Sequence, residues 1–262
     1  MLPSAFKPHQ VEKRNLIRLG PKYDGGYIVH KKSLDKITSI ITCGLNDDWN
    51  FEKEFLKKNP LCKVVAYDHT VDSKFWLLYS LNNFLNLLLL KKLKVRKIID
   101  VFKYIDYKLF FSKENIHIVK KIGKKNNSKE ISINKIFKSI KKNEKTILKI
   151  DIEGDEYKVL KDVKNVETHL DHLIVEFHHV KKNLNTIEKF IKKNKLLKLI
   201  HIHGNNYSPV RKGVPETLEM TFVNKKNYLI KAKKSKYEYP LKGIDYPNLK
   251  RREDISLNFY AR

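Results

Sequence analysis

Cysteine and glycine are scarce in this chain, and no segment is rich in proline, glycine or serine. Its two cysteines, Cys43 and Cys62, form no CxxC pair and no other metal-ligand spacing, so a reducing cytosol is the simpler setting. Without a linker or an internal repeat, the 262 residues are expected to form a single domain. Within it, residues 1–36 are expected to form an N-terminal cap segment, and residues 231–262 a C-terminal tail packed on the domain.

Long apolar runs are also lacking. The most apolar stretch is Phe75–Leu90, FWLLYSLNNFLNLLLL, which is interrupted by serine and asparagine and is shorter than the about 20 residues of a membrane span. A buried amphipathic helix is the favoured interpretation, and a helix lying on a membrane surface is the alternative. Because the N-terminus shows no signal-peptide pattern, we expect a cytoplasmic protein with no transmembrane span.

Acidic residues are few beside basic ones, with 29 Asp and Glu against 55 Lys and Arg and a formal net charge of +26. Such an excess is typical of proteins that contact phosphate-rich partners. However, the excess is mostly lysine spread in short runs, and no RNA-binding motif accompanies it. Nucleic-acid or anionic-glycan binding therefore remains an alternative.

Short β-branched runs alternate with helical patterns from about residue 37 onward, which predicts an α/β fold with a mainly parallel sheet. Seven strands are expected, near Ile37–Thr42, Lys63–Tyr67, Ile116–Val119, Thr146–Ile150, His172–Phe177, Leu196–His203 and Leu218–Val223. Six helices are expected, over Trp49–Lys58, Lys74–Leu90, Val95–Leu109, Ser132–Lys142, Glu156–Val163 and Leu184–Lys193.

Polar residues follow the first two strands of this sheet, where ligands of open parallel sheets bind. Gly44 and Asn46 follow the first strand, and both residue types tolerate the positive φ of a tight turn. Asp68 ends the second strand, where an acidic residue accepts hydrogen bonds from the ribose hydroxyls of an adenosine-containing cofactor. An ordinary strand-to-helix turn with a strand-terminating aspartate would look similar.

A second group of polar residues follows the later strands. Residues two apart on a strand point to one side, so Asp151 and Glu153 are expected to share a crevice if the extended conformation persists. Glu176 and His178 share a face in the same way, and this group would suit proton abstraction or binding of a divalent cation. His201 and His203 repeat the spacing, with a structural role as the alternative.

Several segments, in this order, resemble the FkbM-type methyltransferases from about Arg18 to about Phe259: RLGPKYDGGYIV, ITCGLNDDWNFEKEF, VVAYDHT, ILKIDIEGDEYKVL, LIVEFHH and IHIHGNNYSP with LEMTF. The resemblance implies a Rossmann-like, seven-stranded class I methyltransferase fold. It also implies an enzyme that binds S-adenosylmethionine and methylates a hydroxyl of a sugar, glycan, polyketide or similar small metabolite.

The same resemblance implies roles for single residues. The methionine part of the cofactor would be surrounded by Gly44, Asn46, Asp48 and Glu52, and the ribose, adenine and sulfonium would lie near Asp68, Gly123 and Asp151. Many relatives carry glycine at the position of Asn46, which departs from the pattern. Asp24-Gly25-Gly26 also matches a family segment, without an assigned role.

For the reaction, His178 is the first candidate base, with Asp151 or His203 second. A magnesium-like ion held by Asp151, Glu153 and Glu176 is the other way to activate a hydroxyl. Two further functions stay open: a basic binding module with a non-catalytic methyltransferase fold, and a methyltransferase acting on RNA.

Overall fold

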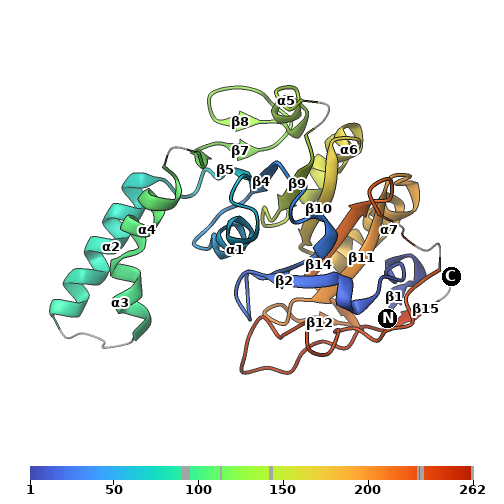
Figure 1. Cartoon of the computed structure of the whole chain (residues 1–262). Coiled ribbons are helices and arrows are strands. Elements are labelled where there is room, and N and C mark those ends of the chain that lie inside the picture. The colour runs from blue at the N-terminus through green and yellow to red at the C-terminus, as the bar shows by residue number, and fades with distance from the viewer. Residues whose placement is uncertain (90–94, 113, 142–143, 229, 231–232, 261–262) are drawn as a thin grey trace.

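The computed structural model describes the whole chain except residues 90–94, 113, 142–143, 229, 231–232 and 261–262. At its centre lies a seven-stranded sheet in the order β11-β14-β10-β9-β4-β5-β6 (Figure 1). All seven predicted strands are confirmed, as β4 (Ser39–Cys43), β5 (Lys63–Tyr67), β6 (Ile116–Ile118), β9 (Thr146–Ile150), β10 (Leu170–Phe177), β11 (Leu197–Gly204) and β14 (Leu218–Asn224).

The strand order identifies the fold. Numbered along the chain, these seven strands run 3-2-1-4-5-7-6, which extends the first five strands of the doubly wound Rossmann order. β14 is antiparallel to both β10 and β11, and every other neighbouring pair is parallel. The predicted Rossmann-like α/β fold of the class I methyltransferases is therefore confirmed.

Seven helices are described in place of the six expected: α1 (Asn50–Lys58), α2 (Ser73–Leu88), α3 (Val95–Val101), α4 (Lys103–Phe110), α5 (Ile133–Phe137), α6 (Glu156–Val166) and α7 (Val180–Lys193). The predicted helix Val95–Leu109 is divided at Phe102, whose ψ of 1° lies outside the helical range. The predicted helix Ser132–Lys142 is also wrong in length, because α5 ends after Phe137.

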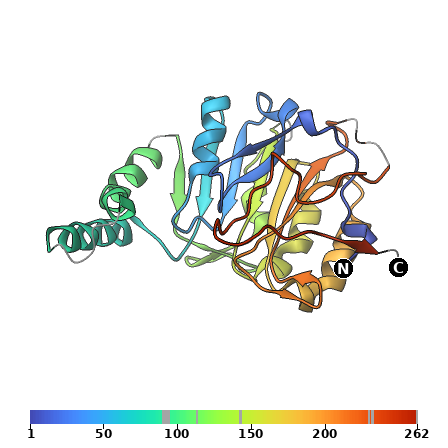
Figure 2. The same cartoon turned by 90° about the horizontal axis from the view of Figure 1, so that it is seen from below.

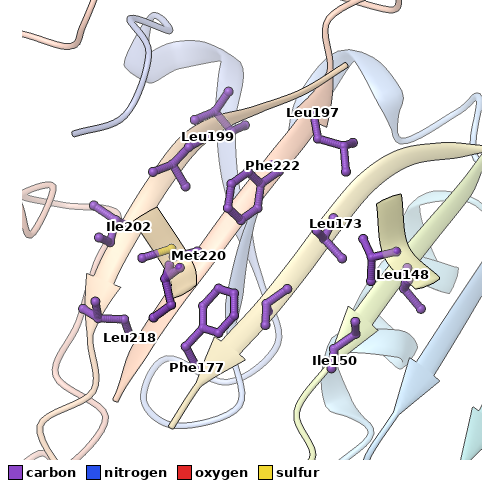
Figure 3. Close-up of a cluster of buried hydrophobic side chains, with 14 of the residues drawn as sticks. Leu148, Ile150, Leu173, Phe177, Leu197, Leu199, Ile202, Leu218, Met220 and Phe222 are labelled. Carbon is purple, nitrogen blue, oxygen red and sulfur yellow. The ribbon is translucent and has the colours of Figure 1, made fainter. Parts of the chain in front are cut away.

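The sheet separates two hydrophobic cores, because successive strand residues point to opposite faces. Leu148 and Leu173 pack in one core with residues of α6 and α7, and Figure 3 shows part of this cluster on β9, β10, β11 and β14. The neighbouring Ile147 and Ile174 pack in the other core, with residues of α1 and of the hairpin formed by β2 (Leu16–Leu19) and β3 (Tyr27–His30).

The two ends of the chain lie side by side. β1 (Leu2–Pro3) pairs in parallel with β15 (Phe259–Tyr260). The hairpin is held to the sheet, since the Thr221 hydroxyl donates to the Ile28 carbonyl at 2.8 Å. Short strand pairs complete the structure, namely β7 (Lys121–Ile122) with β8 (Glu130–Ile131) and β12 (Val210–Arg211) with β13 (Val214–Pro215).

Helices α2, α3 and α4 project from the sheet as a separate bundle, which we call the helical arm (Figures 1 and 2). The prediction of a buried helix at Phe75–Leu90 is wrong for the described residues. Only Trp76, Ser80 and Asn83 of α2 are buried, because α2 packs along one stripe, mainly against α3 and α4, with Trp76 also meeting Trp49 at 5.6 Å between ring centres. Among the described residues, no helix combines the length and apolarity needed to cross a bilayer.

Candidate active site

A cavity of about 1160 Å³ opens at the carboxyl ends of β4, β5, β9 and β10. This is the edge at which parallel α/β sheets bind their ligands. Most of the predicted site residues line it: Gly44, Asn46, Asp48, Asp68, Asp151, Glu153, Glu176 and His178. The structure therefore brings these residues together at one cavity.

The turn after β4 has the backbone conformation expected of it. Gly44 adopts φ of 86° and Asn46 φ of 46°, both in the left-handed region. A Cβ atom on Gly44 would lie 1.6 Å from the carbonyl oxygen of Asp151, so the ends of β4 and β9 touch at a point where only glycine fits. Asn46 takes the positive φ that a second glycine would take, which reconciles the departure from the family pattern.

Asp68 holds this turn from the end of β5. Its Oδ2 accepts hydrogen bonds from the backbone N–H groups of Leu45 and Asn46, at 2.8 and 2.9 Å. Its Oδ1 accepts from the Thr70 backbone and hydroxyl. Burial opposes ionisation, but these hydrogen bonds outweigh it and lower the pKa of Asp68, which keeps the carboxylate charged. Asp68 thus lines the cavity and also shapes the neighbouring loop.

Asp151 and Glu153 both reach the cavity, but not through an extended strand. β9 ends at Ile150, and Glu153 has φ of 54°, so the expected continuation of the strand is wrong. Burial raises the pKa of Asp151 to about 7, and the positive charges of His178 and Lys149 only partly counter it. Asp151 Oδ1 has no hydrogen-bond partner among the described residues.

His178 is surrounded by carboxylates. Its Nδ1 lies 3.0 Å from Glu156 Oε1, and its Nε2 lies 3.4 Å from Glu153, 3.8 Å from Glu176 and 4.0 Å from Asp151. Burial lowers the pKa of His178, but the hydrogen bond to Glu156 and the charge of Asp151 raise it more, so the net shift is upward. The imidazole and the carboxylates predicted at one rim are thus in contact.

Glu156, in the first turn of α6, holds two parts of the site together. Its side chain is fully buried, and Oε1 accepts hydrogen bonds from the backbone of Ile152 and Gly154 as well as facing His178. It therefore fixes both the Asp151–Gly154 turn and the imidazole ring. Glu156 is one of four acidic residues in the segment IDIEGDE, and the sequence alone gave no reason to choose it over the other three.

Both chain ends contribute residues that the sequence pattern did not select. The Tyr27 hydroxyl donates to Glu176 at 3.3 Å and approaches Asp151 at 3.5 Å. Asp24 accepts a hydrogen bond of 3.0 Å from Asn248, and both line the cavity. Asp24 lies in the DGG segment of the family resemblance, which was the available signal for it.

Three predicted site residues lie elsewhere. Glu52 is fully buried and pairs with Lys149 at 3.1 Å and with the Thr42 hydroxyl, so it faces the core beneath the cavity. Gly123 lies against the Glu130 carboxylate, which a Cβ atom would contact at 2.1 Å. Neither is among the residues that line the cavity, although Lys149 and Ile122 beside them are.

His203, the third, is 1% exposed and binds Glu219 at 3.1 Å and Asp254 at 2.9 Å. Burial lowers its pKa, but these two carboxylates raise it to about 10. A buried, permanently charged imidazole has no proton-accepting nitrogen, so His203 is not brought to the site as a base. His201 has a similar structural partner, Asp245, at 2.9 Å.

The charge of the cavity is opposite to that of the chain. Nine Asp and Glu residues line it against four lysines, whereas the whole chain has a net charge of +26. Such a lining attracts cations and polar neutral groups and repels phosphate chains.

One protein-family model matches part of this chain. Residues 98–205, which include Asp151 and His178, match the model of the methyltransferase FkbM domain. No curated protein sequence matches the chain.

Solved structures with a similar fold include three methyltransferase-related proteins. The Methanococcus jannaschii fibrillarin pre-rRNA processing protein has 10% identity and a TM-score of 0.38, over 73% of this chain and 68% of that one. An rRNA methylase from Streptococcus thermophilus has 8% identity and a TM-score of 0.36, over 74% and 90%. A candidate methyltransferase from Streptococcus mutans in complex with SAH has 13% identity and a TM-score of 0.38, over 72% and 90%.

The match runs from within α3 to the end of β11, and it includes β9, α6 and β10 with the turn and the histidine that follow them. Residues 98–205 thus match the methyltransferase FkbM domain, which confirms the resemblance that the motifs predict.

Proposed function

We propose that the protein transfers a methyl group to a hydroxyl oxygen of a sugar, glycan or other small neutral metabolite. The observation that carries this proposal is the acidic lining of the cavity in a strongly basic chain. A neutral polyhydroxyl acceptor meets nine carboxyl side chains as hydrogen-bond partners there, whereas a polyanion would be repelled.

The residues present fit S-adenosylmethionine. The turn from Gly44 to Asn46 lines the cavity, and its Leu45 and Asn46 N–H groups donate to the ionised Asp68, which holds that carboxylate at the cavity. Asp68 is assigned to the ribose, Asn46 and Asp48 to the methionine part, and Asp151 to the neighbourhood of the sulfonium cation. When bound, the cofactor supplies an electrophilic methyl group.

For the transfer itself, the chain positions the acceptor and removes its proton. His178 takes the hydroxyl proton on Nε2, while Glu156 holds Nδ1 and fixes the ring. Asp151 and Glu176 orient the acceptor hydroxyl. With the cofactor bound, this oxygen would form its bond to the methyl carbon as the carbon–sulfur bond breaks, and the electron pair would stay on sulfur.

A divalent cation is a second way to activate the hydroxyl in this site. Ligand atoms of Asp151, Glu153 and His178 all lie within 4.8 Å of one another, and Asp151 Oδ1 has no hydrogen-bond donor among the described residues. These residues would hold the ion, with Glu176 beside them at 3.8 Å from the imidazole. Such an ion would lower the pKa of the acceptor hydroxyl.

The experiment that tests the cofactor is calorimetric titration of the full chain with S-adenosylhomocysteine and its 2′-deoxy analogue. If Asp68 binds the ribose, wild type should lose affinity for the deoxy analogue, and Asp68→Ala should bind both ligands with equal, weaker affinity. If Asp68→Ala still binds S-adenosylhomocysteine more tightly than the deoxy analogue, Asp68 does not bind the ribose and only shapes the turn. Absence of binding by the folded wild type would contradict the proposal and favour the non-catalytic binding module.

The RNA-methyltransferase alternative is separated by its salt dependence. Contact with phosphates releases counterions, so RNA binding should weaken steeply as salt is added. Binding of a neutral acceptor should respond little. If RNA binds tightly, if this binding weakens steeply with salt, and if only other RNA molecules displace it, the RNA-methyltransferase alternative would replace the small-molecule proposal.

A further inference from the structure

The helical arm exposes an unusual number of apolar side chains. Of the nineteen large hydrophobic residues that stand out as exposed in the described chain, thirteen lie on the arm: Phe75, Leu77, Leu78, Leu81, Phe84, Leu85, Leu88, Leu89, Ile98, Ile99, Phe102, Ile105 and Leu109. Monomeric proteins in water rarely expose contiguous apolar surface on this scale without using it.

Helix α2 is apolar on its outer face and partly polar on its buried one. Ser80 and Asn83 share the buried stripe with Trp76, and the Ser80 hydroxyl accepts a hydrogen bond of 2.9 Å from the Tyr104 backbone. The outward residues Leu77, Leu81, Phe84 and Leu88 follow the 4-3-4 spacing of one helix face. A helix that faces water has the opposite pattern, so this face is built for an apolar surrounding.

The charges of the arm indicate which apolar partner covers it. Among the described residues of the arm, five are basic and two are acidic, namely Lys74, Arg96, Lys97, Lys103 and Lys108 against Asp100 and Asp106. Asp106 is already paired with Lys53 of α1. Two copies of the arm packed face to face would bring like charges together, whereas anionic lipid headgroups complement them.

The base of the arm is fixed to the body of the protein beside the cavity. Tyr107 and Phe110 of α4 are buried, and Lys103 Nζ lies 4.2 Å from the centre of a Trp49 ring. Ile99, Asp100 and Lys103 also line the cavity. A surface bound by the arm would therefore lie close to the cavity mouth.

We propose that the helical arm docks the protein on an anionic lipid surface, with the exposed Leu77, Leu81, Leu85 and Leu88 of α2 at the boundary between headgroups and acyl chains. This inference does not depend on the acceptor or on methyl transfer.

Cosedimentation of the full chain with phosphatidylcholine vesicles, with and without phosphatidylglycerol, tests the proposal. Wild type should bind the vesicles that contain phosphatidylglycerol and bind them less at high salt. Leu81→Glu/Leu85→Glu should lower the partition coefficient by at least about tenfold, because it removes buried apolar area and adds repulsion. The control Leu61→Glu/Val210→Glu makes the same charge change at exposed apolar residues outside the arm and should retain binding within about twofold.

Equal losses in the two variants would overturn the proposal, since charge alone would then explain binding. The proposal would also be overturned if the wild type bound neither kind of vesicle and formed a dimer instead. Sedimentation velocity would show this dimer in the wild type and a monomer in Leu81→Glu/Leu85→Glu. A second measurement does not depend on those glutamates. The emission maximum of an environment-sensitive dye attached at Leu85→Cys should shift to the blue when vesicles are added, while that of the same dye at Leu61→Cys should not. An unchanged emission maximum at both positions would contradict docking through α2.

Discussion

Glu156 Oε1 lies 3.0 Å from His178 Nδ1 and accepts a backbone hydrogen bond from Gly154 through the same oxygen. One carboxylate thereby couples the turn after β9 to the imidazole after β10. Since this bond contributes to the raised pKa of His178, its removal has a predictable effect.

Glu156→Gln should lower the pKa of His178, because glutamine keeps an oxygen acceptor but lacks the charge that favours the imidazolium. In wild type the imidazole should titrate above its usual 6.5, and a base at this position should work better as the pH rises. Titration of the histidine ring signals by NMR, assigned with His178→Gln, measures both values without an acceptor. An unchanged midpoint in Glu156→Gln would show that Glu156 does not set this pKa.

Gly44→Ala should destabilise the fold by at least about 2 kcal/mol and abolish S-adenosylhomocysteine binding, because its Cβ would collide with the Asp151 carbonyl and φ is 86°. Gly243→Ala is the matched control. Its φ is 80°, but the nearest atom to its Cβ is 3.8 Å away, so only the backbone strain of about 1 kcal/mol remains. Urea unfolding measures both, and equal losses would show that the contact with β9 is unimportant.

If Asp151, Glu153 and His178 hold a cation, its affinity should increase as the pH rises through neutrality. The pKa of Asp151 is raised to about 7, so this carboxyl must lose a proton to act as a ligand. Mn²⁺ binding followed by electron paramagnetic resonance should be lost in Asp151→Asn. It should persist in Asp155→Asn, whose carboxylate lines the same cavity but pairs with Lys121 at 2.7 Å. If the wild type does not bind Mn²⁺, only the mechanism with His178 as the base remains.

His203 should stabilise the fold in a pH-dependent way. Its pKa is raised to about 10 in the folded protein from its usual 6.5. The folded state therefore binds the proton more tightly, and this contribution is complete below about pH 6.5 and is lost as the pH rises toward 10. His203→Gln should cost about 3 kcal/mol at neutral pH, since it leaves the buried Glu219 and the partly buried Asp254 without their cation. Urea unfolding across this pH range tests it, and a variant with an unchanged pH slope would contradict the assignment.

The sequence predicts most of the sheet because its strands are short β-branched runs bounded by polar residues. Thr146–Ile150 and Lys63–Tyr67 were predicted with the observed bounds. The site follows from the same pattern, since residues that end parallel strands must meet at one edge, as Asp151 and His178 do.

Residues that reach the site from outside the central sheet could not be predicted in this way. Tyr27 and Asn248 come from segments without a periodic pattern, and their approach depends on where the chain ends pack. Glu52 shows the opposite case. A first-turn glutamate looks like a surface residue, and only the placement of Lys149 on the same side of the sheet explains its burial.

The hydrogen bond between Asp24 and Asn248 joins residues 224 positions apart at the rim of the cavity. Neither wall of the cavity is therefore complete until both have been synthesised and folded against the sheet. A nascent chain that has released β9 and β10 from the ribosome already holds Asp151 and His178, yet it lacks the rim that Asn248 provides. A chain that ends before Asn248 would thus keep Asp151 and His178 but leave Asp24 without its hydrogen-bond partner at the rim.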